Sequence, residues 1–487
     1  MASEESDSVK VRTARTIKWN TIDRVFSQVA YAVVGVVLAN LLSQEDFGLV
    51  GVLLIFQAFA IILTDSGFGA ALLRKKNPTA QDYSTVFWFN LVVSILIYAI
   101  LWICAPLIAE RFHDGRLTDM AKVMFTAFVI NGLSIVQTNQ MMKRMDARPI
   151  AIADITGLCV SGIAGICLAL KGAGAWSIVW QTVILAIVKT GMLWVGGGWR
   201  PQTGIHPESL REIWPIGASV LTSSMLNTLS LQLYNIVIGA YYKTLTSLGI
   251  YTQADKWSKM GSASISQILT ASFVPLLAGV QDDAKAFRRY ITRIDRFTAF
   301  ILFPALGGMA AIGDPLFHTL FGDKWDAAIP LFQILCLRGI FVVLTSLHNN
   351  YLLSLGRKGS LIAVEVIKDG LMIVAILCTV WSRSLDLIVW GQFWASALTY
   401  VIVAVITSRA TGYSLLQMLK NLAPFIMVAG AMWAAVWGVG HLRTFPLLRL
   451  AIEISTGAAV YFLICALLGL PELKEAFAYT TGRFRKK

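Results

Sequence analysis

Charged residues are scarce in this chain of 487 residues. Asp, Glu, Lys and Arg make up 14% of it and hydrophobic residues 56%, whereas soluble domains usually carry about 25% charged residues. The mean hydropathy is +0.67. A soluble protein of this composition would expose too much apolar surface to water. The composition therefore excludes an ordinary soluble domain and indicates a protein that crosses a membrane many times.

The sequence also lacks the short motifs of common enzymes and pumps. It has no GxxxxGK[ST] phosphate loop, no HExxH zinc motif and no GxSxG nucleophile motif. The five histidines and six cysteines show no metal-ligand spacing. We interpret the Asp282–Asp283 pair, in a loop rich in Lys and Arg, as a solvated surface. We therefore expect no catalytic residue, no metal site and no cofactor, and an ATP-driven pump would need a separate subunit.

Long apolar runs are what the chain does have. We predict fourteen membrane-spanning helices, because each run is long enough to cross a bilayer at about 1.5 Å per residue. The predicted spans are residues 19–42, 47–73, 83–105, 118–139, 150–171, 174–197, 212–240, 248–280, 293–313, 330–354, 361–381, 386–408, 420–441 and 447–469. The predicted fold is an all-α polytopic membrane protein whose loops are too short to fold as a catalytic domain.

The positive charges are distributed unevenly among the predicted loops. Most of the 41 Lys and Arg residues fall on the side that holds both termini. Because cytosolic loops carry an excess of Lys and Arg, both termini are predicted to be cytosolic. The net charge of +13 is explained by Lys and Arg residues that set the membrane topology and lie next to anionic lipids, so nucleic-acid binding is not needed to explain it. No secretory signal peptide is recognisable before the first span.

A sequence repeat relates the two halves of the chain. PLIAERFHDGRL at 106–117 matches PLFHTLFGDKWD at 315–326, and EDFGLVGV at 45–52 matches TSLGIYTQ at 246–253. Each copy holds six predicted spans, so both copies have the same orientation, with a substrate path where the halves meet. The repeat favours a transporter. The predicted parts are a cytosolic tail (1–18), an N-lobe (19–200), a C-lobe (201–410), two additional spans (411–470) and a basic cytosolic tail (471–487).

Several polar and charged side chains lie inside the predicted spans. Each charge costs about 2.5–3.5 kcal/mol there unless it faces water or a partner. Two lysines one helical turn apart, Lys256 and Lys259, repel each other, so a water-filled cavity or an anionic partner explains them best. We predict a cationic cavity that attracts an anion such as a phosphate or pyrophosphate. Its expected lining residues are Arg24, Gln28, Asn227, Lys256, Lys259 and Arg338.

Some of the intramembrane charges also have a purely structural interpretation. Arg24 would pair with Asp23 or extend its side chain to the membrane interface. Asp65 and Asp154 lie toward cytosolic ends of spans, where they would cap a helix or form a pair. Glu365, Lys368 and Asp369 are spaced for pairing on one helix surface. The sequence alone leaves both interpretations open.

Five segments resemble a known family. They are TIDRVFSQVA at 21–30, SQEDFGLVGV at 43–52, TDSGFGAALLRKK at 64–76, DYSTVFWFN at 82–90 and FGDKWDAAIPLFQIL at 321–335. With them the chain resembles the polysaccharide transport family of the multidrug/oligosaccharidyl-lipid/polysaccharide (MOP) exporter superfamily, especially colanic-acid-type exporters and O-antigen flippases.

This resemblance implies a two-lobed flippase of the bacterial inner membrane. The implied substrate is an oligosaccharide unit linked to undecaprenyl pyrophosphate, carried by alternating access for exopolysaccharide, capsule or O-antigen synthesis. A polysaccharide polymerase and other assembly proteins are the implied partners, together with membrane lipids. Family members are thought to couple transport to an ion gradient. The carboxylates placed to carry the ion are Asp65, Asp154, Glu365 and Asp369.

Two other functions are consistent with parts of this pattern. A drug antiporter of the same fold, similar to multidrug and toxic compound extrusion (MATE) transporters, would need a cavity dominated by carboxylates, and the cations argue against it. A membrane-embedded glycosyltransferase or polymerase would need acidic catalytic groups and usually a large loop over its substrate. The short loops disfavour it.

Overall fold

The computed structural model describes residues 2–65, 67–242, 244–441 and 445–480. All secondary structure in these ranges is helical, which confirms the all-α prediction. The chain divides into two compact units, Met1–Gly249 and Ile250–Lys487, which are described separately below. The lobes predicted from the repeat meet at residue 200, so the boundary of the repeat and that of the compact units differ.

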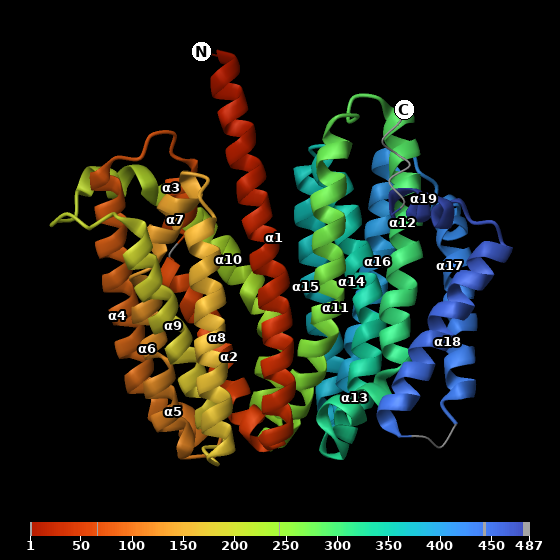
Figure 1. The fold of residues 1–487 in the computed structure, drawn as a ribbon, viewed down its shortest axis with the longest axis horizontal. Coiled ribbons are helices and arrows are strands. Elements are labelled where there is room, and N and C mark those ends of the chain that lie inside the picture. The colour runs from red at the N-terminus through yellow and green to blue at the C-terminus, as the bar shows by residue number, and fades with distance from the viewer. Residues whose placement is uncertain (1, 66, 243, 442–444, 481–487) are drawn as a thin grey trace. The chain divides into compact units, whose positions relative to one another are not determined.

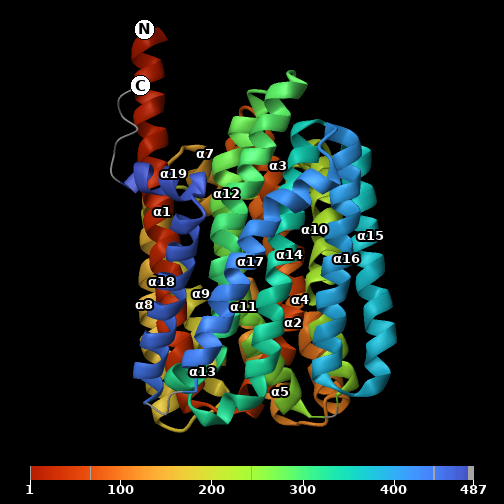
Figure 2. The same cartoon turned by 90° about the vertical axis from the view of Figure 1, so that its right-hand side faces the viewer.

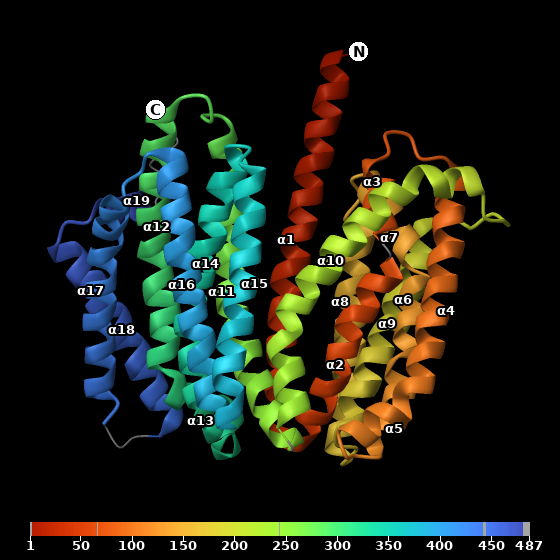
Figure 3. The same ribbon diagram turned by 180° about the vertical axis from the view of Figure 1, so that it is seen from behind.

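The first unit is built from ten helices and the first residues of an eleventh. They are α1 (Ala2–Leu41), α2 (Gln44–Asp65), α3 (Phe68–Arg74), α4 (Ala80–Arg111), α5 (Arg116–Met124), α6 (Thr126–Gly132), α7 (Ile135–Lys143), α8 (Arg148–Leu170), α9 (Trp176–Gly197) and α10 (Pro207–Tyr241), followed by the start of α11 (Leu245–Ala278). The helices α1 and α9 both pack along α8, while α10 packs along α2 and α3 (Figures 1 and 3).

The second unit contains the rest of α11 and the helices that follow. They are α12 (Ala284–Ala311), α13 (Gly313–Phe321), η1 (Asp323–Ala328), α14 (Ile329–Ser354), α15 (Lys358–Thr379), η2 (Val380–Ser382), α16 (Leu385–Thr411), α17 (Leu415–Val439), α18 (Pro446–Leu467) and α19 (Pro471–Thr480). Within this unit α14 packs on α16, α15 on α16, and α12 on α17 (Figure 2).

Eleven helical segments of the described chain are long and apolar enough to cross a membrane. This confirms a multi-pass membrane protein, while the number of fourteen spans stays a prediction. Each predicted span overlaps a helix or a run of short helices. The long helices α10, α11 and α15 are not among the eleven, and these three carry three of the six predicted cavity residues and two of the four candidate ion-coupling carboxylates. In α15, for example, Glu365, Lys368 and Asp369 fall within 22 residues.

Local sequence signals explain where several helices begin. At the start of α4, the Asp82 carboxylate accepts the Thr79 backbone N–H at 2.8 Å, and the Thr79 hydroxyl accepts the Asp82 backbone N–H at 3.2 Å. Ser43 and Asp46 make the same reciprocal pair before α2. Such capping boxes satisfy N–H groups that have no partner within the helix.

The two copies of the repeat share a local feature in the loops that follow the segments beginning at Pro106 and Pro315. The sequence repeat aligns His113 with Gly322, and both residues have a positive φ, of 57° and 76°. Each follows the end of a helix, and each precedes an aspartate, Asp114 or Asp323. Both copies therefore place a residue with positive φ at the position before this aspartate.

Aligned residues of the two copies also form a close contact between helix backbones in the first unit. The repeat aligns Gly48 with Gly249, and Gln44 with Leu245. A Cβ atom added to Gly48 would lie 1.9 Å from the carbonyl oxygen of Leu245, and one added to Gly249 would lie 2.0 Å from that of Gln44. The two close approaches are thus reciprocal, as a local two-fold relation requires. Only glycine allows the starts of α2 and α11 to approach so closely.

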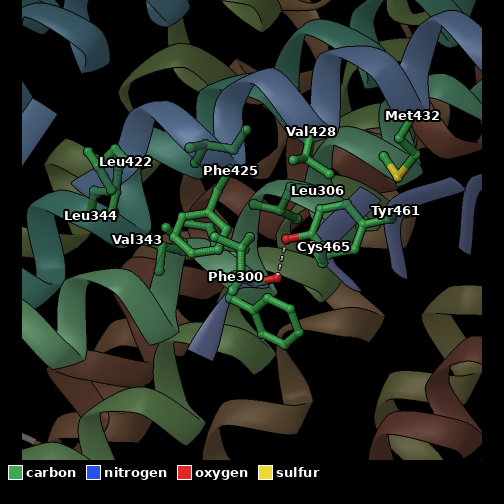
Figure 4. Packing of buried hydrophobic residues seen from close by; sticks show 14 of the residues in the cluster. Phe300, Leu306, Val343, Leu344, Leu422, Phe425, Val428, Met432, Tyr461 and Cys465 are labelled. Atoms are coloured by element: carbon green, nitrogen blue, oxygen red, sulfur yellow. Dashed lines mark hydrogen bonds between the residues drawn. The ribbon is translucent and has the colours of Figure 1, made fainter. Parts of the chain in front are cut away.

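The core of the second unit includes the two C-terminal spans (Figure 4). Phe300 of α12, Phe425 of α17 and Tyr461 of α18 are buried in one apolar cluster. The Tyr461 hydroxyl donates a hydrogen bond of 2.8 Å to the Phe300 carbonyl oxygen. The spans that we expected as an addition to a twelve-span protein therefore contribute to the core of this unit.

Candidate functional site

Three of the predicted cavity residues lie in the first unit. Arg24 and Gln28 are exposed on α1, and Asn227 is exposed on α10. Arg24 and Gln28 on α1, and Ser219, Ser223 and Asn227 on α10, recur every four residues and so form one polar stripe on each helix; Ser219 and Ser223 are exposed as well. Core packing within the unit therefore leaves these polar residues of α1 and α10 exposed.

A cluster of charges joins α1, α8 and α9 in the first unit. Lys189 and Asp154 form an ion pair with an N–O distance of 2.5 Å. The Asp154 charge also acts on Asp23 and on Tyr31, and Ser27 donates a hydrogen bond of 3.2 Å to Asp23. Asp154 thus has a cationic partner, as the structural interpretation of this residue expected. The cluster holds two carboxylates and one lysine within reach of the α1 stripe.

Asp65 lies at the break between α2 and α3. Its carboxylate accepts the backbone N–H of Gly69 in the first turn of α3. Gly69 also lies close to the Asn139 amide, since a Cβ atom added to Gly69 would be 2.6 Å from its Nδ2 atom. This geometry favours a capping role for Asp65.

The charged stripe of α11 is exposed in the second unit. Lys259 and Asp255 form an ion pair of 2.6 Å, in which the Lys259 side chain is 46% exposed and the Asp255 side chain 8%. Lys256 is exposed and its Nζ atom lies 5.4 Å from the centre of the Trp257 ring. Asp255 therefore compensates one lysine, and Lys256 supplies the net positive charge of this turn.

Arg338 of α14 is the third predicted cation of the second unit. Its Nε atom donates a hydrogen bond of 3.2 Å to the Ser396 hydroxyl of α16. The next residue, Gly339, lies against Ser262, because a Cβ atom added there would be 3.1 Å from the Ser262 Cβ. Ser262 is one turn after Lys259 on α11. The structure therefore brings α11 and the Arg338 region together within this unit.

The predicted cavity draws its residues from both units. Arg24, Gln28 and Asn227 belong to the first, whereas Lys256, Lys259 and Arg338 belong to the second. A single cavity that contains all six stays a prediction.

The acidic candidates of α15 pair with a lysine of the same helix. Lys368 contacts Glu365 directly and lies 3.8 Å from Asp369. The Glu365 side chain is 52% exposed and that of Asp369 39%. This arrangement favours the structural interpretation, in which Lys368 pairs with the two carboxylates on a helix surface.

A buried polar group in the second unit was not among the predicted site residues. Asp295 of α12 is 2% exposed, and its carboxylate accepts a 2.8 Å hydrogen bond from the Tyr351 hydroxyl of α14. His348 is 1% exposed, and its Nε2 atom lies 3.8 Å from the same carboxylate oxygen. Its Nδ1 atom has no hydrogen-bond partner among the residues that the structure describes. An aspartate within a predicted span was the available signal, because such residues are functional candidates by default.

We expect Tyr351→Phe to destabilise the second unit more than Tyr461→Phe. Both hydroxyls are buried and each donates one hydrogen bond of 2.8 Å, to the Asp295 carboxylate and to the Phe300 carbonyl oxygen respectively. Bonds to a charged group contribute about 1.5–3 kcal/mol and neutral ones about 0.5–1.5 kcal/mol. Thermal unfolding of the purified variants measures the difference. Equal losses would show that Asp295 is not charged in the folded protein.

One cluster has the composition of a metal site. His318, Asp323 and Asp326 bring their ligand atoms within 4.8 Å of one another, and two of the three are exposed. The His318 Nε2 atom lies 3.2 Å from a carboxylate oxygen of Asp326. A protonated imidazole between carboxylates fits the same geometry, so the cluster carries no metal assignment.

The chain is similar to known polysaccharide proteins along most of its length. A family profile described as "Polysaccharide biosynthesis protein" matches residues 37–330. Teichuronic acid biosynthesis protein TuaB of Bacillus subtilis (strain 168) is 24% identical over 96% of this chain and 97% of its own length. Lipopolysaccharide biosynthesis protein WzxC of Escherichia coli (strain K12) is also 24% identical, over 76% of this chain and 75% of its own. Succinoglycan biosynthesis transport protein ExoT of Rhizobium meliloti (strain 1021) is 22% identical over 83% of this chain and 85% of its own.

Solved transporter structures share the fold. The lipid II flippase MurJ in an inward closed conformation matches with a TM-score of 0.72 and 13% identity, over 93% of this chain and 98% of its own. An inward-facing multidrug MATE transporter of the MOP superfamily matches with a TM-score of 0.60 and 15% identity, over 82% of this chain and 100% of its own. The fold is therefore that of MOP transporters. The profile covers more than half of the chain, which confirms the resemblance to polysaccharide transport proteins noted from the sequence, and the protein belongs to the family of polysaccharide biosynthesis proteins.

Proposed function

We propose that the protein is a flippase for undecaprenyl-pyrophosphate-linked oligosaccharides. It would move them from the cytosolic to the periplasmic leaflet of the inner membrane by alternating access, and both termini would be cytosolic. Relatives named for lipopolysaccharide biosynthesis and for succinoglycan transport support a glycan substrate. The fold shared with a lipid II flippase supports a lipid-linked one. Such a protein is a secondary transporter and not an enzyme.

The observation that carries this proposal is the exposed charge on α11. In a helix of 34 residues, Lys256 and Lys259 are exposed one turn apart. Charges exposed to lipid are costly, so they would face a wet cavity. Cations in such a cavity favour an anionic headgroup, and a pyrophosphate supplies two adjacent anionic groups. Arg24, Gln28, Asn227 and Arg338 would complete the headgroup contacts.

Ion coupling is part of the same proposal. Asp65, Asp154, Glu365 and Asp369 stay candidates from their positions in the sequence. Asp295 joins them, since a buried carboxylate beside an imidazole can hold and release a proton. A polysaccharide polymerase and other assembly proteins would take the flipped unit at the periplasmic side.

Deletion of the gene tests the proposed function. We expect the lipid-linked oligosaccharide to accumulate in the cytosolic leaflet while the surface glycan is lost, and full-length protein to reverse both effects. Extraction of labelled lipid-linked sugars and their accessibility to a periplasmic ligase measure the result. An altered drug-sensitivity profile with a normal surface glycan would contradict the proposal and favour the antiporter. Sugar transfer to a lipid acceptor by the purified protein would favour the glycosyltransferase.

A further inference from the structure

A groove in the second unit lies where α12 and α17 both begin. Its volume is about 610 Å³. The two helices pack along each other, and Figure 2 shows them side by side. The lining residues are mostly cationic or amide-bearing: Ala284, Lys285, Arg288, Arg289, Thr292, Tyr413, Gln417, Lys420 and Asn421. None of them belongs to the predicted transport cavity.

Within the described residues the four cations of this groove, Lys285, Arg288, Arg289 and Lys420, form no ion pair. The Arg289 charge does act on Asp283, which caps the start of α12 by accepting the Lys285 and Ala286 backbone N–H groups. The contrast on the same helix is clear. One turn further along α12, Arg293 pairs with Glu475 at 3.0 Å and Arg296 pairs with Glu472 of α19. The second unit therefore neutralises the arginines beside the groove and leaves those inside it available for an anion.

The wall of the groove supplies hydrogen-bond donors as well as charge. Tyr413 is buried, with 1% exposure, and the Asn421 amide donates to its hydroxyl. Arg288 is oriented by a 3.3 Å hydrogen bond to the Thr411 carbonyl oxygen. Guanidinium and amide donors that converge on a concave surface suit the oxygens of a phosphate. If these cations served only to set the orientation of the helices in the membrane, neither the groove nor the amide side chains in it would be needed.

The surroundings of the groove indicate that the phosphate belongs to a lipid. Leu416 and Leu419 of α17, each adjacent in sequence to a groove residue, are 61% and 59% exposed. Exposed leucines beside exposed cations fit the boundary between acyl chains and headgroups. Basic pockets between spanning helices at the cytosolic face are known to hold anionic headgroups, and the charge distribution predicts that α12 and α17 begin at that face.

We propose that the groove between the starts of α12 and α17 binds the phosphodiester headgroup of an anionic phospholipid. Lys285, Arg289 and Lys420 supply the charge, while Arg288 and the Asn421 amide orient the phosphate. The headgroup of the bound lipid would contact the first turns of both helices and so link α12 to α17 within the second unit. The site is separate from the proposed transport function, and this proposal does not depend on which molecule is transported.

The test uses full-length protein in nanodiscs, with phosphatidylglycerol titrated into phosphatidylcholine and bound lipid counted by native mass spectrometry. Arg289→Gln/Lys420→Gln is expected to weaken phosphatidylglycerol binding at least tenfold. Both side chains are exposed, and Arg288 is left in place because it contacts the backbone near Thr411. The matched control is Arg357→Gln/Lys358→Gln, which removes two exposed cations at the other predicted cytosolic loop of this unit.

Three outcomes would overturn the proposal. One is an equal loss of binding in the groove variant and the control, because the effect would then be one of total charge. Another is no preference for phosphatidylglycerol over phosphatidylcholine in the unaltered protein. The third is full displacement of the lipid by millimolar inorganic phosphate, which would identify a site for soluble phosphate instead. The single variant Lys285→Gln, at an exposed position in the first turn of α12, provides a second measurement if the double variant does not fold.

Discussion

Lys256→Glu is expected to lower glycan export at least tenfold while the protein remains folded in the membrane. Lys256 is exposed on α11, and its neighbour Lys259 is already paired with Asp255 at 2.6 Å. Reversing the charge would therefore turn the net charge of this turn from positive to negative. An anionic headgroup would then be repelled where it is now attracted, with little change in packing. Export is measured as surface glycan per molecule of membrane protein.

The matched control for this variant is Lys358→Glu, an exposed lysine at the start of α15. It makes the same change of net charge away from the α11 stripe, so export should stay within about twofold of the unaltered protein. Arg24→Ala tests the first unit in the same way and should also reduce export. Normal export by both Lys256→Glu and Arg24→Ala would remove the cationic cavity from the proposal, while the family assignment would stand.

Gly48→Ala is expected to destabilise the first unit by more than about 3 kcal/mol, beyond the usual range for an overpacked site. The added methyl group would lie 1.9 Å from the Leu245 carbonyl oxygen. That neighbour is backbone and cannot rotate away, so the starts of α2 and α11 would have to separate. Gly249→Ala should have a similar effect, since its methyl group would lie 2.0 Å from the Gln44 carbonyl oxygen. The thermal unfolding midpoint and the yield of folded protein measure both variants.

Gly191→Ala provides the control within the same unit. No atom lies within 4 Å of a Cβ built on this residue of α9, and it is exposed. Alanine is the better helix former by about 1 kcal/mol, so the variant should be as stable as the unaltered protein or slightly more stable. If Gly48→Ala were tolerated as well as Gly191→Ala, the close backbone contact would not exist in the folded protein.

The repeat in the sequence identified particular residues correctly. It aligned Gly48 with Gly249, and these two residues make reciprocal contacts. It also aligned His113 with Gly322, and both have a positive φ. Backbone conformation and close approach depend on local residue size, which the sequence shows directly. The compact units divide the chain at residue 249, because α10 packs on α2 and α3 of the first unit, whereas the predicted lobes, which stay a prediction, divide it at residue 200.

The candidate site was predicted less completely than the fold. Lys256 and Lys259 were chosen because two cations one turn apart need an explanation, and both are exposed. That Lys189 is the partner of Asp154, and that Asp295 is buried beside His348, was not predicted. Each depends on how two or three helices are rotated against one another. A single helix with one acidic residue looks the same in sequence whether that residue meets a partner, lipid or water.

The sequence by itself determined that this protein is helical, crosses a membrane many times and belongs to a family of polysaccharide biosynthesis proteins. Composition and the length of apolar runs decide the first two properties, because a chain in a bilayer must satisfy its backbone hydrogen bonds within each span, while the family follows from the residues of the matched segments. Only the tertiary structure decided which charges are compensated. It pairs Asp154, Arg296 and Glu365 with opposite charges and, among the described residues, leaves Lys256 and the cations of the α12–α17 groove without an ion pair. The reason is that an ion pair forms over a few ångströms, and only packing brings side chains of different helices that close.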